Sequence, residues 1–500
     1  MDACLHRNDV LNFSEVSDKY RIKNLVKMNH NLEILIKQKV SHLKVVDIIS
    51  QIAERDKVKV YAVGGFVRDV ILNRERNDLD VLVIGSGIDF AKNVADKLKI
   101  ENVSYYKNFG TAHFDYQGMN IEFVGARKES YDRTTRKPIV EDGTFEDDIK
   151  RRDFTINTLA ISLNKIDFGK LIDTYNGLAD IESKLIRTPL DPFKTFDDDP
   201  LRIMRAFRFA AQLNFNVDES IMIAAKEMRE RLSIVSQERI TDEFLKILAS
   251  PKPSVGFTLL FDSGVLEIVF PEISIMAGVD QRKDYHHKDV FLHTLQVVDN
   301  ICRETDDVWL RFAALVHDIA KPPTKKFVEG IGWTFHGHEE LGARMMKKIF
   351  IRLKLPLHKL EYIQKLIRLH LRPIALAKED VTDSAIRRFV VNAGEDLEDL
   401  IILCRADITS KNPIKVEKYL ANYERVMQKV RDVKERDQLR AFQSPVRGEE
   451  IMQICNLKPS RKVGEIKTAI EEAILDGKIG NNYEEAYKYL MEIKDQLLEN

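Results

Sequence analysis

The chain has 500 residues, of which 44% are hydrophobic and 31% charged, and this length excludes a single core. We expect three or four units in a globular protein that is rich in helix. The net charge of -1 neither indicates nor excludes a nucleic-acid partner, because acidic residues elsewhere can offset a basic groove.

The cysteines and the apolar pattern favour a cytoplasmic protein. The four cysteines are scattered, form no CxxC pair and are best interpreted as reduced thiols. The sequence has no run of about 18 apolar residues, and its N-terminus is too polar for a signal peptide.

Helix and strand patterns alternate in the first part of the chain. Residues 1–40 form a polar extension, and a mixed α/β head follows over 41–185. The predicted helices cover 40–57, the stretch that begins at 66, and 87–99. The predicted strands cover 58–65, 78–85, 103–107, 113–117 and 119–126.

The remainder of the chain is predicted to be helical, which gives an α+β protein overall. A helical neck spans 186–275, with breaks at SPKPS and FPE. A second helical block with its own chemistry spans 276–410, and a charged helical tail spans 411–500.

Two aspartates stand at the start of the predicted strand DLDVLVIG. Side chains alternate along a strand, so Asp78 and Asp80 point to the same face while Leu79 points into the core. Two neighbouring carboxylates repel each other unless a cation lies between them, and Mg²⁺ is the natural candidate beside a phosphate. We therefore expect Asp78 and Asp80 to be catalytic ligands of Mg²⁺.

A glycine pair and an arginine precede these aspartates. Gly64 and Gly65 let the backbone approach a ligand, and the helix that follows offers N–H groups to phosphate oxygens, with Arg68 in its first turn. Taken singly, a DxD pair is usually solvated charge and a glycine pair usually marks a turn. The ordered set in one short stretch favours a nucleoside triphosphate site.

Long motifs carry a family resemblance. The segments YAVGGFVRDVILNRERNDLDVLVIG (61–85) and KRRDFTINTLAISL (150–163) are similar to signatures of the class II tRNA nucleotidyltransferase and bacterial poly(A) polymerase family. Residues 172–188 and 198–215 resemble the signatures that follow, and the resemblance is continuous from about 58 to 270. It implies transfer of a nucleotide from a triphosphate to an RNA 3′-hydroxyl.

The segment DDPLRIMRAFRFA contains the residues predicted to select the base of the incoming nucleotide. The segment is predicted to be helical, so Asp199 and Arg202 share a face at i, i+3 spacing and can act as a pair. Cytosine and adenine each present an amino donor beside a ring-nitrogen acceptor, which suits an Asp–Arg pair. The resemblance implies the same role for this pair, and nucleotide contacts for Arg152, Arg205 and Arg208. Without it, Arg205 and Arg208 would be interpreted as solvated or ion-paired.

Two further features of the head bear on the reaction. In the family, the loop that corresponds to 126–149 helps to switch between adding C and adding A, and an Arg/Lys-Pro stretch is present here. This argues against an enzyme that adds only CC. Glu122, on the strand NIEFVG, is a candidate third carboxylate that we leave outside the core site.

The second helical block is rich in histidine. Eight of the 12 histidines fall within 85 residues, where uniform scatter would place about two. They are His286, His287, His293, His317, His336, His338, His358 and His370. The adjacent His317 and Asp318 on an apolar helix need a partner or a metal, and imidazole with carboxylate suits a transition metal. The alternative is a degenerate site in which buried histidines only form hydrogen bonds.

This block resembles the HD phosphohydrolase domain. The resemblance implies a divalent metal held by His293, His317, Asp318 and Asp407, with His338 and His370 as additional ligands or phosphate contacts. It also implies hydrolysis of phosphate esters, for instance 2′,3′-cyclic or terminal phosphates on damaged RNA ends.

Our leading hypothesis is a CCA-adding enzyme that uses CTP, ATP and Mg²⁺ on tRNA, held by the helical neck and an RNA-binding tail. We expect neither a membrane nor DNA as a partner. The first alternative is a poly(A) polymerase of the same family, although the tail lacks the strongly basic character often found there. The second is an RNA-binding phosphohydrolase with an inactive head, which would predict a broken DxD or RRD motif, and both are intact.

Overall fold

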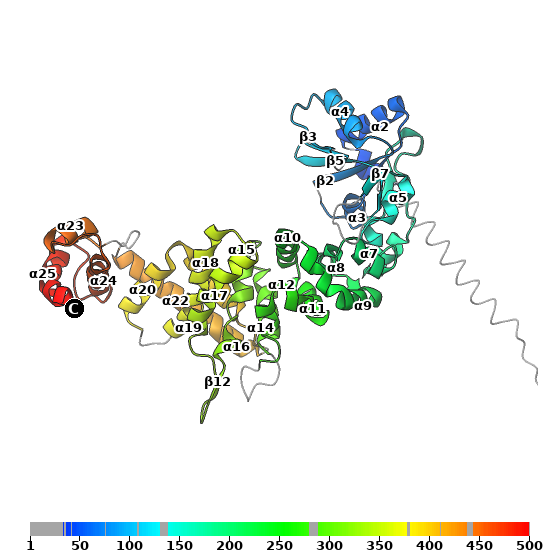
Figure 1. Ribbon diagram of the computed structural model, residues 1–500. Coiled ribbons are helices and arrows are strands. Elements are labelled where there is room, and N and C mark those ends of the chain that lie inside the picture. The colour runs from blue at the N-terminus through cyan, green and yellow to red at the C-terminus, as the bar shows by residue number, and fades with distance from the viewer. Residues whose placement is uncertain are drawn as a thin grey trace, which may run out of the picture. The chain divides into compact units, whose positions relative to one another are not determined.

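The computed structural model describes residues 34, 37–41, 43–75, 77–107, 110–130, 139–279, 289–377, 381–410, 412–437 and 444–499. The chain divides into two compact units, with the boundary between Val235 and Ser236 (Figure 1). His286, His287 and most of the predicted extension 1–40 lie outside the described residues.

The first unit is built on a mixed sheet, as predicted. Seven strands lie in the order β3-β4-β5-β2-β1-β8-β9. The neighbours β2 and β5 are parallel, and the other neighbours are antiparallel. The strands are β1 (Val60–Val63), β2 (Asp78–Val83), β3 (Ser104–Tyr106), β4 (Thr111–Tyr116), β5 (Met119–Gly125), β8 (Ala160–Ser162) and β9 (Leu171–Ile172).

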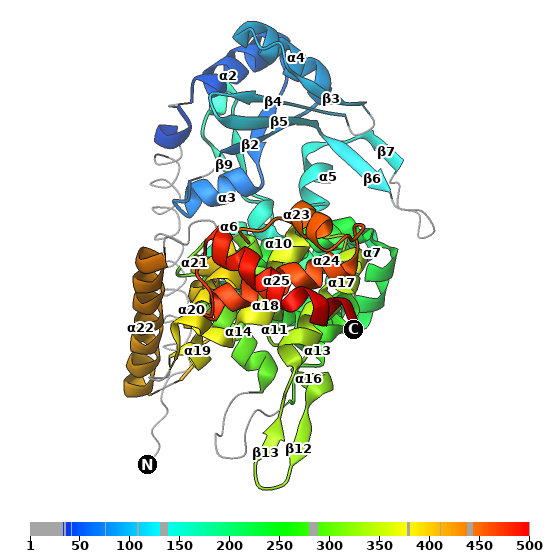
Figure 2. The same ribbon diagram turned by 90° about the vertical axis from the view of Figure 1, so that its left-hand side faces the viewer.

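The first unit also contains helices, some of which pack on this sheet. They are α2 (Lys44–Asp56), α3 (Gly65–Ile71), α4 (Gly87–Leu98), α5 (Phe145–Lys150), α6 (Gly177–Glu182), α7 (Pro192–Asp198), α8 (Leu201–Leu213) and α9 (Glu219–Met228). Helix α4 packs on strands β2, β4 and β5 and against α2 (Figure 2). It begins at the cap Ser86, whose hydroxyl accepts from the Asp89 N–H, and its apolar stripe is buried.

The charged segment 126–149 forms regular structure where turns were expected. Strands β6 (Arg127–Ser130) and β7 (Ile139–Asp142) make an antiparallel hairpin, whose tip at 131–138 lies outside the described residues. Helix α5 follows and starts with a capping box between Thr144 and Asp147. A short parallel pair, β10 (Leu185–Ile186) and β11 (Asn216–Val217), lies further along the chain.

The prediction of one helix through Asp199 was wrong. Helix α8 begins at Leu201, and Asp199 has extended backbone with φ -145° and ψ 103°. The reason is Pro200, because a proline ring disfavours the helical region for the residue before it and fits the start of a helix. Asp199 therefore does not share a helix face with Arg202.

The second unit is helical, and the predicted breaks are confirmed. At SPKPS, α10 ends with Leu248 and α11 begins with Pro253; at FPE, α12 ends with Val269 and α13 begins with Pro271. The helices up to 410 are α10 (Gln237–Leu248), α11 (Pro253–Asp262), α12 (Val265–Val269), α13 (Pro271–Ser274), α14 (Val290–Ile301), α15 (Val308–Val316), α16 (Lys321–Thr324), α17 (His338–Arg352), α18 (Leu360–Leu369), α19 (Arg372–Leu376), α20 (Asp383–Ala393) and α21 (Leu397–Ala406).

One hairpin interrupts this block, where only helices were expected. Strands β12 (Lys326–Val328) and β13 (Gly332–Thr334) pair antiparallel. The sequence KFVEGIGWT joins β-forming residues to two glycines, and Gly330 and Gly332 both have positive φ. The hairpin signal was therefore present in the sequence.

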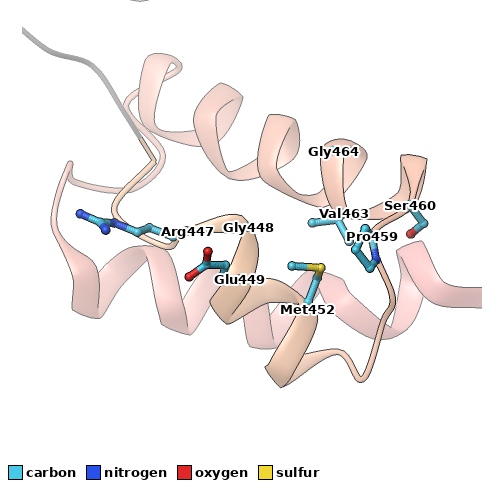
Figure 3. A pocket seen from close by; sticks show the side chains of 8 residues that line it. All are labelled: Arg447, Gly448, Glu449, Met452, Pro459, Ser460, Val463 and Gly464. Atoms are coloured by element: carbon cyan, nitrogen blue, oxygen red, sulfur yellow. The ribbon is translucent and has the colours of Figure 1, made fainter.

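The tail is helical, as predicted, and its last three helices share a small core. The helices are α22 (Pro413–Asp437), α23 (Gly448–Ile454), α24 (Arg461–Leu475) and α25 (Tyr483–Glu499). Val446, Ile451, Ile466, Ile470 and Leu490 are buried in this core. A pocket of about 450 Å³ opens between the first turns of α23 and α24 (Figure 3). None of the helices within the described ranges is both long enough and apolar enough to cross a membrane.

Candidate functional sites

The first site lies at the start of strand β2. Asp78 and Asp80 are partly exposed while Leu79 is fully buried, which confirms that the two aspartates share one face. In the parallel pairing of β2 with β5, Asp80 lies directly opposite Glu122. Three carboxylates thus belong to one face of the sheet, on its adjacent strands β2 and β5.

Glu122 is the residue that sequence reasoning left outside the site. Burial and then the charge of Asp80 raise its pKa, whereas His113 and Arg127 lower it. The sequence places Glu122 on a predicted strand, which was the available signal. Only the pairing of β2 with β5 brings Glu122 beside Asp80. A group of carboxylate oxygens that repel one another fits a hard divalent cation such as Mg²⁺.

Gly64 joins this group to an arginine. It caps helix α3 with φ +72°, and a Cβ built there would lie 2.9 Å from Arg152 Nη1 and 3.5 Å from Asp80 Oδ2. The backbone at Gly64, the carboxylate of Asp80 and the guanidinium of Arg152 therefore meet in one place. Gly65 is the first residue of α3, whose N-terminal N–H groups begin there.

Helix α5 holds Arg152 in position. Asp148 is fully buried, and its Oδ2 accepts from Arg152 Nη2 at 2.9 Å while its Oδ1 accepts from Arg151. Burial disfavours its charge, but Arg152 and Arg151 keep the pKa of the Asp148 carboxyl below its usual value. This anchor restricts Arg152 while its Nη1 points to the space beside Gly64.

The third residue of the RRD motif ties the head to helix α8. Asp153 Oδ2 accepts from Arg205 Nε at 2.9 Å and Nη2 at 2.6 Å, and Oδ1 accepts from Asn157. Although burial opposes ionisation, Arg205 and Asn157 hold the pKa of the Asp153 carboxyl well below its usual range. Arg205 is ion-paired with the motif in this structure.

Arg68 is buried rather than open to a ligand. Its side chain is 2% exposed, and its guanidinium donates to Asp69 and to Asn157 Oδ1 at 2.7 Å. Its Cζ lies 4.9 Å from the centre of the Phe209 ring, which Arg205 and Arg208 also approach. Arg68 thus contacts the network that positions the site.

Arg202 and Arg208 extend this network along α8. Arg202 donates to the carbonyl oxygens of Arg151 at 2.6 Å and Thr195 at 3.3 Å. Arg208 lies 4.4 Å from the Phe209 ring centre. Asp199 Oδ1 accepts from the Leu201 N–H at the start of the helix. Of the two predicted base-reading residues, Arg202 therefore contacts the RRD motif directly, and Asp199 precedes the helix that carries Arg202.

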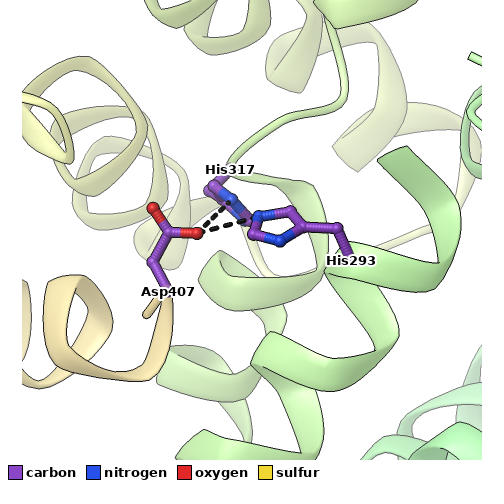
Figure 4. Close-up of side chains that lie close together, drawn as sticks. All are labelled: His293, His317 and Asp407. Atoms are coloured by element: carbon purple, nitrogen blue, oxygen red, sulfur yellow. Dashed lines mark ion pairs between the residues drawn. The ribbon is translucent and has the colours of Figure 1, made fainter. Parts of the chain in front are cut away.

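The second site brings together the predicted histidines of the helical block. Asp407 Oδ1 lies 2.9 Å from His293 Nε2 and 3.5 Å from His317 Nε2 (Figure 4). These three side chains converge from α14 and from the ends of α15 and α21. The four predicted ligands form one centre, because Asp318 Oδ2 lies 3.2 Å from His317 Nε2.

Two further histidines complete this centre. Asp318 Oδ1 lies 3.4 Å from His338 Nε2 and 3.9 Å from His370 Nε2. The six residues fall into two groups of possible metal ligands, His293–His317–Asp407 and Asp318–His338–His370. Of the other histidines in the cluster, His336 and His358 are exposed and lie outside both groups.

The same local contact orients three of the imidazoles. His317, His338 and His370 each place Nδ1 within 2.7 to 2.8 Å of the carbonyl oxygen three residues earlier. An Nδ1–H that donates to a carbonyl leaves Nε2 with its lone pair toward the centre, as in metal-ligating histidines. The Nε2 atoms of His338 and His370 are 3.4 Å apart, and two lone pairs at that distance need a cation between them.

The buried atoms at the centre support the same interpretation. Within the described chain, His317 Nε2 and Asp407 Oδ1 are buried and have no hydrogen-bond partner. Burial opposes the charged form of His317, yet Asp318 and Asp407 raise the pKa of its imidazole to about 10. His317, His370 and Asp407 each cap a helix C-terminus, where the macrodipole favours positive charge. The residues therefore fit divalent metal ions.

Family models match three parts of the chain. Residues 60–187 match the family model described as the poly(A) polymerase head domain, and 214–276 match a probable RNA-binding segment of such polymerases. Residues 290–412 match the HD domain.

Relatives with curated names share much of the chain. An A-adding tRNA nucleotidyltransferase of Deinococcus radiodurans is 32% identical over 68% of this chain and 77% of its own length. A multifunctional CCA protein of Vibrio campbellii is 30% identical over 72% of this chain and 88% of its own length.

A solved structure extends the comparison to the fold. A tRNA nucleotidyltransferase in complex with a primer tRNA and an incoming ATP analogue matches 76% of this chain and 98% of its own, with a TM-score of 0.56 and 25% identity. The chain belongs to the tRNA nucleotidyltransferase and poly(A) polymerase family, with an HD domain after the polymerase head.

Proposed function

We propose that the protein adds CCA to the 3′ end of tRNA, with CTP and ATP as substrates. The observation that carries this proposal is the meeting of Asp80, Gly64 and Arg152 in one place, next to Asp78 and Glu122. The names of the relatives, which include CCA and A-adding proteins, support tRNA as the acceptor.

The residues at this site suit attack by a 3′-hydroxyl on the α-phosphorus of a nucleoside triphosphate. The new P–O bond joins the nucleotide to the RNA, and pyrophosphate leaves. Asp78 and Asp80 would hold Mg²⁺, which neutralises phosphate charge and favours the ionised hydroxyl. Arg152, held by Asp148, donates to the triphosphate from a fixed position, which costs little reorganisation during the reaction.

Base selection is assigned to Asp199 and Arg202. The carboxylate accepts from the amino group that cytosine and adenine share, and the guanidinium donates to the adjacent ring nitrogen. Arg202 uses two donor atoms for the carbonyl oxygens of Arg151 and Thr195, and a guanidinium has five N–H donors. Arg205 and Arg208 would support the nucleotide from the same helix.

The tRNA itself is expected to contact the tail mainly through its phosphates and shape. The pocket between the first turns of α23 and α24 is lined by Arg447 and Ser460, with Arg461 and Lys462 beside it in the sequence (Figure 3). Glu449 also lines the pocket, and the three cations with the Ser460 hydroxyl suit an RNA backbone.

A second candidate is addition of the terminal A alone, since a relative of 32% identity carries that name. Primer extension separates the two. Three tRNA transcripts, ending before CCA, after C and after CC, are offered CTP, ATP or both with Mg²⁺. Extension of all three to CCA followed by a stop supports the proposal. Extension only of the transcript ending in CC identifies an A-adding enzyme, and long A tails identify a poly(A) polymerase.

We further propose that the HD domain is a phosphohydrolase with two divalent metal ions. The groups His293–His317–Asp407 and Asp318–His338–His370 would each hold one ion, and Asp318 lies 3.2 Å from His317 of the other group. Imidazole with carboxylate favours transition metals. Such a pair would activate water to attack a phosphate ester, for instance a 2′,3′-cyclic or terminal phosphate of RNA.

Metal analysis of the purified chain tests the second ion. We expect two transition-metal ions per chain, and one after the double substitution His338→Ala/His370→Ala. His358→Ala, which changes an exposed histidine outside both groups, is the matched control and should retain two. A wild-type chain that binds a single ion, unaffected by the double substitution, would contradict the two-metal centre.

A further inference from the structure

The hairpin β12–β13 exposes an aromatic pair on one face. Phe327 and Trp333 lie directly opposite each other in the register, so their side chains share a face, and their ring centres are 5.2 Å apart. Phe327 is 55% exposed and Trp333 39%. The hairpin projects from the helices of its unit (Figures 1 and 2). An apolar surface of this kind on so short a hairpin indicates a binding site.

Positive charge accompanies these rings. Lys325 Nζ lies 4.5 Å from the centre of the Trp333 ring, and Lys326 is exposed beside Phe327. The segment 321–336 carries three lysines and one glutamate. Aromatic faces that stack on bases, next to cations that neutralise phosphates, are the composition of a single-stranded RNA site.

The hairpin also leads directly into the metal centre. Phe335, just after β13, offers its carbonyl oxygen to His338 Nδ1 at 2.8 Å. Lys321 Nζ lies 5.8 Å from the Phe335 ring centre and 2.7 Å from Asp318 Oδ2. Trp333 is five residues from His338, so the two are at most about 18 Å apart. That distance corresponds to a few nucleotides of RNA.

We propose that the hairpin 325–334 binds the single-stranded end of an RNA, with bases stacked on Trp333 and Phe327, and presents the terminal phosphate ester to the HD centre. Lys321, between the hairpin and Asp318, would contact that phosphate. In the hydrolysis of a cyclic end, water forms a bond to phosphorus, one ribose P–O bond breaks, and the leaving oxygen takes a proton. This last part rests on the proposed phosphohydrolase function, whereas RNA binding by the hairpin does not.

Tryptophan fluorescence tests the binding directly, because the chain has only two tryptophans. Trp309 packs near Phe312 and Phe350, and Trp309→Phe leaves Trp333 as the single reporter. The full chain is titrated with a short oligoadenylate that ends in a 2′,3′-cyclic phosphate, and with an abasic oligomer of equal length and charge. We expect quenching by the oligoadenylate and affinity lower by about tenfold or more for the abasic oligomer. Equal quenching by both, or none, would overturn the proposal.

Hydrolysis assays distinguish the role of the hairpin in presenting RNA from the phosphohydrolase activity of the HD domain. The measured quantity is the ratio of kcat/KM for the cyclic oligoadenylate to that for 2′,3′-cyclic AMP. Phe327→Ser/Trp333→Ser should lower this ratio about tenfold or more, while Ile331→Ser at the exposed hairpin tip should not. An unchanged ratio in the double variant refutes the presenting role. If the metal-loaded wild type hydrolyses neither substrate, the phosphohydrolase proposal fails, and the fluorescence titration still decides whether the hairpin binds RNA.

The competing partner is a second copy of the chain. Sedimentation of the wild type and the double variant distinguishes it. If the double variant loses self-association and keeps its affinity for the oligoadenylate, the aromatic pair is a contact between copies and the RNA proposal is wrong. An unchanged oligomeric state with weakened RNA binding is the result that we expect.

Discussion

At the scale of a single residue, Gly64 lies between Asp80 on strand β2 and the guanidinium of Arg152. An alanine there is strained by its φ of +72° and places a Cβ 2.9 Å from Arg152 Nη1. Gly118 has φ +81° with open space around it, so Gly118→Ala is a matched control for strain alone. We expect both variants to lose stability, by about 1 to 3 kcal/mol for Gly64→Ala, because ψ of -135° places Gly64 outside the left-handed helical region.

The two glycine variants should differ in catalysis. Only Gly64→Ala displaces Arg152, so its kcat/KM for CTP should fall about tenfold further, as one lost phosphate contact predicts. Steady-state addition of CMP to a tRNA transcript measures this difference. Equal losses in the two variants would mean that Arg152 does not act on the nucleotide.

The Asp153–Arg205 pair predicts a pH-dependent effect on stability. Arg205→Ala leaves a buried carboxylate without its cation and should cost about 3 kcal/mol near neutral pH. Because Arg205 holds the pKa of Asp153 below its unfolded value, this contribution is fully present above about pH 4 and is lost as pH falls through the lowered native pKa. Denaturant unfolding from pH 7 to pH 3 measures the onset of this loss, which begins near the unfolded pKa and is complete only below the lowered native pKa. A difference between wild type and variant that stays constant over this range would exclude the linkage.

The placement of some site residues could be predicted from the sequence and that of others could not, for physical reasons. The shared face of Asp78 and Asp80 follows from strand periodicity alone. The place of Glu122 depends on which strands pair, and periodicity does not contain that information. The nucleotide contact of Arg68 stays a prediction, and the motif does not show that Asp69 and Asn157 engage its guanidinium in this structure.

At the scale of elements, α5 is expected to set the position of the arginine at the triphosphate. Asp148→Asn removes the charge that holds Arg151 and Arg152, so the KM for CTP and ATP should rise about tenfold. Glu146→Gln on the same helix is the matched control, because Glu146 is exposed and outside this contact. A larger effect on kcat than on KM in Asp148→Asn would contradict a role in nucleotide binding.

Most elements of the head and helical blocks could be predicted from periodicity. The start of α8 could not be inferred from helical spacing, because Pro200 breaks the pattern that the apolar residues suggest. The hairpin β12–β13 was overlooked inside a helical block, although its glycines and β-branched residues were visible. At the start of α8 and in the hairpin β12–β13, the proline or the glycines determine the structure rather than the helical pattern of the surrounding residues.

At the scale of the whole molecule, the two sites belong to different compact units. All ligands of the HD centre lie in the second unit, and the carboxylates of the head lie in the first. We therefore expect His317→Ala/Asp318→Ala to lose the bound transition metals and to keep CMP addition within about twofold of wild type. Metal analysis and primer extension on the same sample measure both. Loss of nucleotide addition in a folded variant would show that the sites are coupled.

The ligands of the HD centre could be predicted from the sequence, but their arrangement could not. The histidine cluster indicated a metal centre, and His293, His317, Asp318 and Asp407 do converge. The division into two ligand groups required the structure, because it depends on how helices α14, α15, α17, α18 and α21 pack. The identity of each metal follows from donor chemistry and remains a prediction.

The proposed function requires that Asp78 and Asp80 of the head take part in nucleotide transfer to the 3′ end of tRNA. The most direct measurement is the single-turnover rate of the first CMP addition to a tRNA transcript that ends before CCA, for the wild type and for Asp78→Asn/Asp80→Asn. We predict a loss of at least about 10³-fold, with tRNA affinity and thermal unfolding close to those of the wild type. A double variant that is folded, binds tRNA and adds CMP at the wild-type rate would contradict the claim.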